Sequence, residues 1–544
     1  MENKKLSVQE IKFILLVSFI LIIVTGLSFI FGYFIKGNLI YTGINIFSPI
    51  DGPVYYSYIE QIKEGNFLLD NLFSNETGAV KLFNPFWLFV GLIARIFQLS
   101  APGAYHLFRI ILTPLFLLVL YKFISFFYPD LTLKRKKLCF LYSIFASGLS
   151  SFWLVFNNYP ALIQKFSVAM DLWVPESSNF LILFCSPHFL ASLTLIILIF
   201  YYFFKFNETK KIKYSILAGL LALFLFSFHP FYVLTVYGVL LTYLLVSFIK
   251  NKKIAWLSIL NYSILVLISL PAVFYYLYLM ATNLDLQIKA QQNNCLTPDV
   301  LVFLVSYGPG LIMASLAIIY LLKKKSLTEK KLFLIIWFLI TIVLIYGPFN
   351  FQRRLSEGFQ VPLTLLAFMG LLVLYDFFKN KYSIFKDLKM RQFLIFFIIF
   401  FCLSNVTAYF FNLKYLSSKP EIVYVRPEIV SALTWYKSQT NLEDAILASP
   451  ANGNIIPGLI GRRVFLGHDK ETINFKAKLV QADWFFSSNQ DDKSKKEFLE
   501  NNHLAYVFYT DNEKKLGDYN PAEKDYLKLV YQDNGVEIYK FNPD

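Results

Sequence analysis

Asp51 is the most informative candidate for chemistry in this chain. It stands in the segment Ser48-Pro49-Ile50-Asp51-Gly52-Pro53-Val54-Tyr55-Tyr56, directly after the first long apolar stretch. A carboxylate beside a surface of low dielectric constant can act as a general base toward a hydroxyl group. We therefore predict Asp51 as a catalytic residue, with Tyr55 orienting it or stacking on a substrate ring. The alternatives are a helix cap or loop acid for Asp51 and an interfacial aromatic belt for Tyr55.

Two histidines, each beside a proline, are candidates for substrate binding. His188 lies in Ser186-Pro187-His188-Phe189 and His229 in Phe228-His229-Pro230-Phe231. Each is expected at the end of an apolar segment, on the same side as Asp51. A lone histidine there usually forms a hydrogen bond at a helix end, but two on one side favour a ligand site.

Arginines form a third group of candidates. Arg353 and Arg354 are adjacent in a loop that also contains Glu357. Because guanidinium groups suit phosphate oxygens, we predict that these three residues contact substrate. An ion pair with Glu357, or binding of lipid headgroups, is the alternative. Arg109, close to His106 at the start of an apolar segment, is predicted to bind lipid phosphate or another loop.

Other sequence features narrow the chemistry. Arg462-Arg463 and His468-Asp469 are expected in a surface turn. No GxxxxGK[ST] or GxGxxG phosphate loop is present, which argues against ATP-driven transport and a soluble nucleotide-sugar fold. No Asp-x-Asp follows the first apolar segment, so no metal site is indicated; a divalent metal is left open as a cofactor.

The elements that must position these residues are membrane helices. Hydrophobic residues make up 56% of the chain and charged residues 16%. Apolar runs recur at about the 20-residue length needed to cross a bilayer, and the first is too long for a cleaved signal peptide. The sequence predicts a mostly α-helical membrane protein with about eleven spans near 13–35, 104–126, 138–156, 186–204, 214–229, 231–249, 255–278, 298–322, 332–348, 360–378 and 393–412.

The distribution of charge predicts the orientation. The chain has a net charge of +15, yet residues 413–544 contain 17 Lys and Arg against 19 Asp and Glu. The excess of basic residues therefore lies in short loops between apolar segments, as the positive-inside rule predicts for cytoplasmic loops. This places the N-terminus inside and residues 413–544 outside a cell membrane. It leaves a first outer loop at about 36–103, within which Asn84 to Leu99 is predicted to form an amphipathic helix.

The character of the chain changes after residue 412. We predict two domains: a transmembrane catalytic domain over 1–412 and an extracytoplasmic α/β domain over 413–544. In the second domain the pattern favours a helix at 430–438 and strands at 445–449, 463–467 and 505–510. Asp533-Asn534-Gly535 between two apolar runs predicts a hairpin.

These features together resemble the GT-C superfamily of polytopic glycosyltransferases, which includes protein O-mannosyltransferases, aminoarabinose transferases and oligosaccharyltransferases. The resemblance covers nearly the whole chain. It rests on a long outer loop that opens with Asp51, on Asn84-Pro85-Phe86 opening a helix, and on Arg109 near the start of the next span. Ser186-Pro187-His188-Phe189, Gln352 to Gly358, and the block from Ala432 to Val464 complete it.

The resemblance implies an enzyme that takes a sugar from a polyprenyl-phosphate donor to a glycan, lipid or protein acceptor on the outer face of the membrane. It implies inversion at the sugar, with Asp51 as the base. Many relatives have a second acid beside the first, where this chain has Gly52. Glu60, Asp70 and Glu76 are the candidates for a second carboxylate.

Two other classes of function compete with the enzyme. A transporter or flippase for a lipid-linked sugar would often show repeated halves and charges at the middle of the bilayer. We find no internal repeat, and the prominent charges lie at the outer edge. A non-catalytic assembly factor of the cell envelope would use residues 413–544 as a binding module and would not need Asp51.

Overall fold

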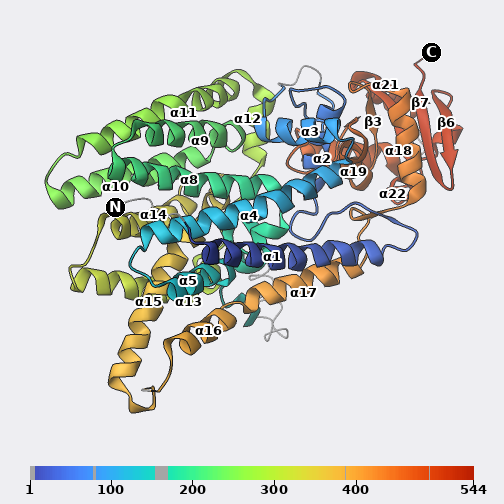
Figure 1. The fold of residues 1–544 in the computed structure, drawn as a ribbon. Coiled ribbons are helices and arrows are strands. Elements are labelled where there is room, and N and C mark those ends of the chain that lie inside the picture. The colour runs from blue at the N-terminus through green and yellow to red at the C-terminus, as the bar shows by residue number, and fades with distance from the viewer. Residues whose placement is uncertain (1–5, 77–80, 153–168, 386, 489–490, 544) are drawn as a thin grey trace. The chain divides into compact units, whose positions relative to one another are not determined.

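The computed structural model describes residues 6–76, 81–152, 169–385, 387–488 and 491–543 (Figure 1). Within these ranges, eight helical segments are long and apolar enough to cross a membrane, and the chain is a multi-pass membrane protein. They are α1 (Val8–Phe34), α4 (Ala101–Phe127), α8 (Pro187–Thr209), α10 (Tyr232–Asn251), α11 (Trp256–Thr282), α13 (Val300–Lys323), α15 (Gln360–Lys381) and the segment Met390–Ser417, which contains α16 (Met390–Phe400) and α17 (Leu403–Ser417).

Three predicted spans correspond to shorter helices. α9 (Ile212–Phe228) and α14 (Glu329–Ile345) have 17 residues each. α5 (Leu133–Phe145) covers the first half of the span predicted at 138–156, whose last residues lie outside the described ranges. The mostly helical fold is therefore confirmed. Of the roughly eleven spans predicted, eight meet the length of a crossing helix in the described residues.

The described chain divides into two compact units. The first unit contains residues 1–26, 109–276 and 295–412 and is entirely helical in its regular structure. Its helices pack closely in pairs, for example α13 with α15. A Cβ atom at Gly370 of α15 would lie 1.9 Å from the carbonyl oxygen of Met313 in α13. A glycine at this point thus lets the two backbones touch, as small residues do between membrane helices.

The second unit contains residues 27–108, 277–294 and 413–544. Its five-stranded sheet has the order β4-β3-β5-β7-β6, with β3 (Ala445–Leu447) parallel to β4 (Arg463–Val464) and β5 (Leu504–Tyr509). β7 (Val536–Phe541) pairs antiparallel with β5 and with β6 (Leu527–Asp533). The predicted hairpin is confirmed, with Asn534 and Gly535 at φ values of 41° and 80° in its turn.

Alternation of apolar side chains along the strands builds a core on each face of this sheet. Ile446, Tyr506 and Phe508 belong to one buried cluster, together with residues of α18 (Pro427–Gln439) and α19 (Pro450–Ile460). Leu447 and Val507 belong to the other, with residues of α20 (Phe475–Ser487) and α21 (Asp492–Asn501). The predicted helix at 430–438 and the predicted strands are confirmed, although β3 and β4 are shorter than expected.

Residues of the predicted first outer loop belong to the same unit as the C-terminal residues. β1 (Ile40–Tyr41) pairs antiparallel with β2 (Tyr424–Val425), and the amide of Val464 donates to the carbonyl oxygen of Leu72 at 3.0 Å. α3 (Pro85–Ile96) is too short to cross a bilayer. Asn84 caps α3 by accepting from the amide of Trp87, as the helix-opening sequence predicts.

α2 (Asp51–Lys63) is placed by close contact with α19 and α3. A Cβ atom at Gly458 of α19 would lie 2.7 Å from Cα of Pro53, and one at Gly91 of α3 would lie 2.6 Å from Cβ of Ile62. Because glycine lacks a Cβ atom, α19 approaches the backbone of α2 and α3 packs closely on the side chain of Ile62. The first turn of α2 is thereby held against the C-terminal part of the chain.

Candidate active site

Asp51 is the first residue of α2 and contacts a histidine from the C-terminal region. Nε2 of His468 lies 3.1 Å from Oδ1 of Asp51. The two side chains differ in exposure: that of Asp51 is 50% exposed, whereas that of His468 is 2% exposed. A buried imidazole therefore holds one oxygen of a carboxylate that a substrate can reach.

The tautomer of His468 follows from its other nitrogen. The amide of Lys470 donates to Nδ1 of His468 at 3.0 Å, so Nδ1 is an acceptor. In the neutral imidazole the proton is then on Nε2, which donates to Asp51. The carboxylate of Asp469 also lies near Nδ1, at 3.4 Å. In this tautomer the ring presents an N–H to Asp51.

The loop around His468 is fixed by backbone contacts and one threonine. A Cβ atom at Gly453 would lie 1.9 Å from the carbonyl oxygen of Leu466, and one at Gly467 would lie 2.4 Å from that of Gly453. Thr472 accepts from the amide of Gly467 at 3.0 Å, and its own amide donates to the carbonyl of His468 at 2.9 Å. The loop thus closes on itself against the start of α19.

The prediction of a surface turn for Arg462-Arg463 and His468-Asp469 was wrong for three of these residues. Arg462, Arg463 and His468 are 6%, 3% and 2% exposed. Arg463 forms a buried ion pair with Asp70 at 2.6 Å, and Arg462 one with Glu64 at 2.8 Å. A charged side chain can be buried when it is paired with an opposite charge. The acidic residues within 60–76 are the sequence feature from which buried basic partners could have been predicted.

The candidates for a second carboxylate all have cationic partners. Glu60 lies 2.7 Å from Lys63 and 3.1 Å from Lys437. Asp70 pairs with Arg463, as described above. Glu76 lies 2.7 Å from Lys478, a lysine whose pKa is lowered by burial. These ion pairs tie the outer loop to the C-terminal residues within one unit, and a second catalytic acid stays a prediction.

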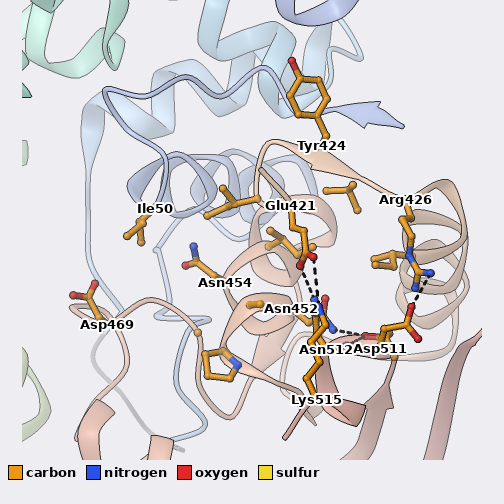
Figure 2. Close-up of a pocket in the computed structure, with 18 of the residues that line it drawn as sticks. Ile50, Glu421, Tyr424, Arg426, Asn452, Asn454, Asp469, Asp511, Asn512 and Lys515 are labelled. Carbon is orange, nitrogen blue, oxygen red and sulfur yellow. Dashed lines mark hydrogen bonds and ion pairs between the residues drawn. The ribbon is translucent and has the colours of Figure 1, made fainter. Parts of the chain in front are cut away.

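A cavity of about 430 Å³ lies in the same unit, and Figure 2 shows Ile50 and Asp469 in its lining. Ile50 and Asp469, which line it, are the chain neighbours of Asp51 and His468. Asn452 and Asn454 of α19 and the apolar side chains of Ile422, Val425, Ile429 and Ile455 also line it. The cavity therefore offers both hydrogen-bonding groups and an apolar wall next to the exposed carboxylate.

Tyr55 lies one turn after Asp51 on α2 and joins a group of stacked rings. Its ring centroid is 5.2 Å from that of Trp87 and 6.4 Å from that of Tyr105, with interplanar angles of 15° and 22°. Offset stacking of this kind stabilises the contact of α2 with α3 and α4. Contact of Tyr55 with a substrate stays a prediction.

In the first unit, His188 and His229 lie together. Their ring centroids are 4.8 Å apart and nearly perpendicular, and the guanidinium of Arg354 lies 5.7 Å from the ring of Phe231 beside them. Nδ1 of His229 has no hydrogen-bond partner among the described residues. Burial lowers the pKa of His229 well below its usual value, and the charge of Arg354 adds to this effect. Binding of a substrate by His188 and His229 stays a prediction.

Arg353 and Glu357 have separate partners. Nε of Arg353 lies 3.6 Å from Glu176, and Arg353 is one-third exposed. Glu357 is fully buried and accepts hydrogen bonds from the hydroxyl groups of Ser192 and Tyr232. Burial raises the pKa of the Glu357 carboxyl well above its usual value. Contact of Arg353, Arg354 and Glu357 with a substrate stays a prediction, and so does the alternative of an ion pair with Glu357.

Arg109 is buried within α4. It donates to the hydroxyl of Thr25 at 2.8 Å and to the carbonyl oxygen of Leu183 at 3.0 Å. These contacts link three segments of the first unit, and binding of a lipid phosphate by Arg109 stays a prediction.

The part of the chain that the structure describes contains no group of three or more His, Cys, Asp or Glu side chains arranged to hold a metal ion. Around Asp51 the donors are one carboxylate and one imidazole, with Asp469 on the far nitrogen of the ring. A divalent cation can also be held by one or two carboxylates together with substrate phosphates, so a metal cofactor stays open.

No protein-family model matches the sequence, and no curated protein sequence matches it. Solved structures do match the fold. The oligosaccharyltransferase of Archaeoglobus fulgidus in the apo form aligns over 93% of this chain and 72% of its own, with a TM-score of 0.52 and 12% identity. The same enzyme tethered to an acceptor peptide containing the NVT sequon gives a TM-score of 0.53 at 12% identity, over 89% of this chain and 68% of its own.

ArnT from Cupriavidus metallidurans in the apo state aligns over 95% of this chain and 97% of its own, with a TM-score of 0.52 and 9% identity. The oligosaccharyltransferase and ArnT, an aminoarabinose transferase, are both GT-C enzymes. The fold of this chain is therefore similar to the folds of these two enzymes, in line with the resemblance that the sequence motifs indicate.

Proposed function

We propose that this chain is a membrane glycosyltransferase that moves a sugar from a polyprenyl-phosphate-linked donor to an acceptor on the outer face of the cytoplasmic membrane. The observation that carries the proposal is the half-exposed carboxylate of Asp51, held by the buried His468 beside a cavity. The shared fold supports the donor class, because the archaeal oligosaccharyltransferase has been solved in complex with a dolichol-phosphate and an inhibitory peptide at a TM-score of 0.51.

In the proposed reaction Asp51 is the general base. The oxygen of the acceptor hydroxyl attacks the anomeric carbon of the sugar, and its proton passes to the carboxylate of Asp51. The bond between the anomeric carbon and the phosphate oxygen breaks, and the lipid phosphate leaves with the electron pair. One displacement inverts the anomeric centre, as in the base half of an inverting glycosidase.

The remaining candidates take supporting roles in the proposal. Arg353 and Arg354 bind the phosphate of the donor, where negative charge develops as the lipid leaves. His188 and His229 bind the sugar or the phosphate, and the buried carboxyl of Glu357 contacts α8 and α10 by accepting hydrogen bonds from Ser192 and Tyr232. No step is assigned to a metal.

The decisive experiment measures transfer of radiolabelled sugar from polyprenyl-phosphate donors by the purified protein. Asp51→Asn keeps the shape of the side chain but removes the base. We expect the transfer rate to fall by roughly 10²–10⁴-fold, the range for loss of a general base. Asp518→Asn, at an exposed acid of the same unit, is the matched control and should transfer at the wild-type rate.

Full activity in a folded Asp51→Asn protein would reject Asp51 as the base. Movement of a lipid-linked sugar across proteoliposomes by the wild type, with no transfer to any acceptor, would replace the enzyme by a flippase. Loss of function on deletion of residues 413–544, but not in Asp51→Asn, would instead indicate an assembly factor.

A further inference from the structure

We infer that the cavity beside Asp51 binds the acceptor, and that the bound part of the acceptor is an uncharged, hydroxyl-rich group of the carbohydrate class. This inference rests on the proposed function and extends it to the identity of the acceptor. Three properties of the cavity carry it: a buried amide oxygen with no hydrogen-bond partner among the described residues, two cations that already have acidic partners, and apolar side chains in the same lining as the amides.

The unpartnered amide belongs to Asn454, in the second turn of α19. Asn454 is 6% exposed, and its side chain lines the cavity, as labelled in Figure 2. Its Oδ1 has no hydrogen-bond partner among the described residues. A buried polar atom in this state lowers stability unless a ligand or water satisfies it. An amide oxygen accepts hydrogen bonds, so the group that satisfies Asn454 is a donor, and a hydroxyl group is one such donor.

Asn452 lies two residues earlier on the same helix, and its side-chain amide is bonded to other residues of the fold. Its Nδ2 donates to Thr510 at 2.9 Å and to both carboxylate oxygens of Glu513, at 2.8 and 2.9 Å. Glu513 in turn accepts from the amides of Ser449 and Thr510, at 2.7 and 2.8 Å. Asn452 is therefore held by the fold, whereas the oxygen of Asn454 is left for a ligand.

The charges of the lining disfavour a phosphate or another anion. Three acidic and two basic side chains line the cavity. Arg426 donates to Asp511 at 3.2 Å, and Nζ of Lys515 lies 3.7 Å from Glu421. Because both cations have acidic partners, the remaining acid, Asp469, leaves the lining with an excess of negative charge. The negative charge of Asp469 repels an anion that enters the cavity, whereas an uncharged group meets no such repulsion.

The lining of the cavity contains both apolar and hydrogen-bonding side chains, which suits the apolar faces and polar edge of a sugar ring. Ile422, Val425, Ile429 and Ile455 supply apolar surface, while Asn454, Asn512 and Asp469 supply hydrogen-bonding groups. A sugar ring presents C–H groups on its faces and hydroxyl groups along its edge, so it can contact both kinds of wall at once. The position beside Asp51 would bring one acceptor hydroxyl toward the base.

The test uses the full-length protein in nanodiscs, which avoid sugar-based detergents. The probes are the methyl glycosides of glucose, galactose, mannose and N-acetylglucosamine, and binding is measured by saturation-transfer NMR. We expect at least one glycoside to bind wild type, with no displacement by inorganic phosphate. Asn454→Leu, which keeps the volume but removes the amide, should weaken binding about tenfold, the value of one hydrogen bond. Asn542→Leu, at an exposed residue of the same unit, should bind as wild type does.

A thermal unfolding measurement separates loss of binding from loss of the fold. Replacing an unsatisfied buried amide should leave the melting temperature of Asn454→Leu at or above that of wild type, and Asn454→Ala supplies a second variant if leucine does not fit. The inference is overturned if no glycoside binds, if both Asn454 variants bind as wild type does, or if inorganic phosphate or a short neutral peptide binds in place of the glycosides.

Failure of this inference can be told apart from failure of the proposed function. If wild type transfers sugar but Asn454→Leu leaves the KM for the acceptor unchanged, the function stands and the cavity is not the acceptor site. If the cavity binds glycosides but wild type transfers no sugar, the cavity is a carbohydrate site and the transfer reaction is rejected.

Discussion

At the scale of the residue, the candidate site depends on one contact between side chains 417 positions apart. Nε2 of His468 holds Oδ1 of Asp51, and the amide of Lys470 sets the tautomer that makes this possible. A base whose carboxylate is oriented in advance needs less reorganisation when the substrate arrives. In the proposed reaction, His468 is therefore a positioning residue, which acts through Asp51 rather than on the substrate.

This role predicts the effect of replacing His468. His468→Ala should lower kcat by roughly 10–100-fold, because the carboxylate loses its fixed orientation, while the KM for the donor stays unchanged. His468→Gln can place an amide N–H close to the position of Nε2 and should recover part of the loss. The measurement is steady-state transfer by the three proteins. Equal activity of the alanine and glutamine variants would speak against an orienting hydrogen bond.

At the scale of the element, α19 is the helix on which the site is built. Its glycines bring it to backbone contact with the 466–467 loop at one point and with α2 at another, so that the same helix places His468, Asp51 and Asn454. Backbone contact of this kind leaves no room for a side chain. The tolerance of the site to substitution should therefore be lowest at these glycines rather than at the exposed polar residues.

Gly453→Ala tests this explanation. The added Cβ would lie 1.9 Å from a carbonyl oxygen that no rotamer change can move, so we expect the free energy of unfolding to fall by about 1–3 kcal/mol or more. Gly238→Ala is the control, because no atom lies within 4 Å of its Cβ position inside α10. That change should be neutral or stabilising by about 0.5–1 kcal/mol. Thermal unfolding in detergent compares them, and equal melting temperatures would contradict the packing argument.

At the scale of the whole molecule, the reaction requires that Asp51 and residues 413–544 face the outside of the cell. The contrast between basic loops and a nearly balanced C-terminal region predicts this orientation. Alkaline phosphatase fused after Asp544 should be active, and green fluorescent protein at the same point should be dark. Fusions after Lys325, in a basic loop, should show the reverse pattern. A fluorescent C-terminal fusion would refute both the orientation and the proposed side of transfer.

The sequence by itself determined the class of this protein and most of its elements. Runs of apolar residues predict the membrane helices, Asn84 predicts the start of α3, and Asn534-Gly535 predicts the hairpin. Each prediction succeeds because the structure at that point depends on residues that are close in the chain. Asp51 could be singled out for the same reason, since it follows the first span directly.

Only the tertiary structure decided what surrounds Asp51. His468 and the arginines beside it have local sequences typical of a surface turn, and their burial depends on acids nearly four hundred residues earlier in the chain. Asn452 and Asn454 look equivalent in the sequence, yet the amide nitrogen of Asn452 is bonded to Thr510 and Glu513, whereas Oδ1 of Asn454 has no partner among the residues that the structure describes. Such differences arise from how distant backbones approach one another, a property that no local pattern of residue types encodes.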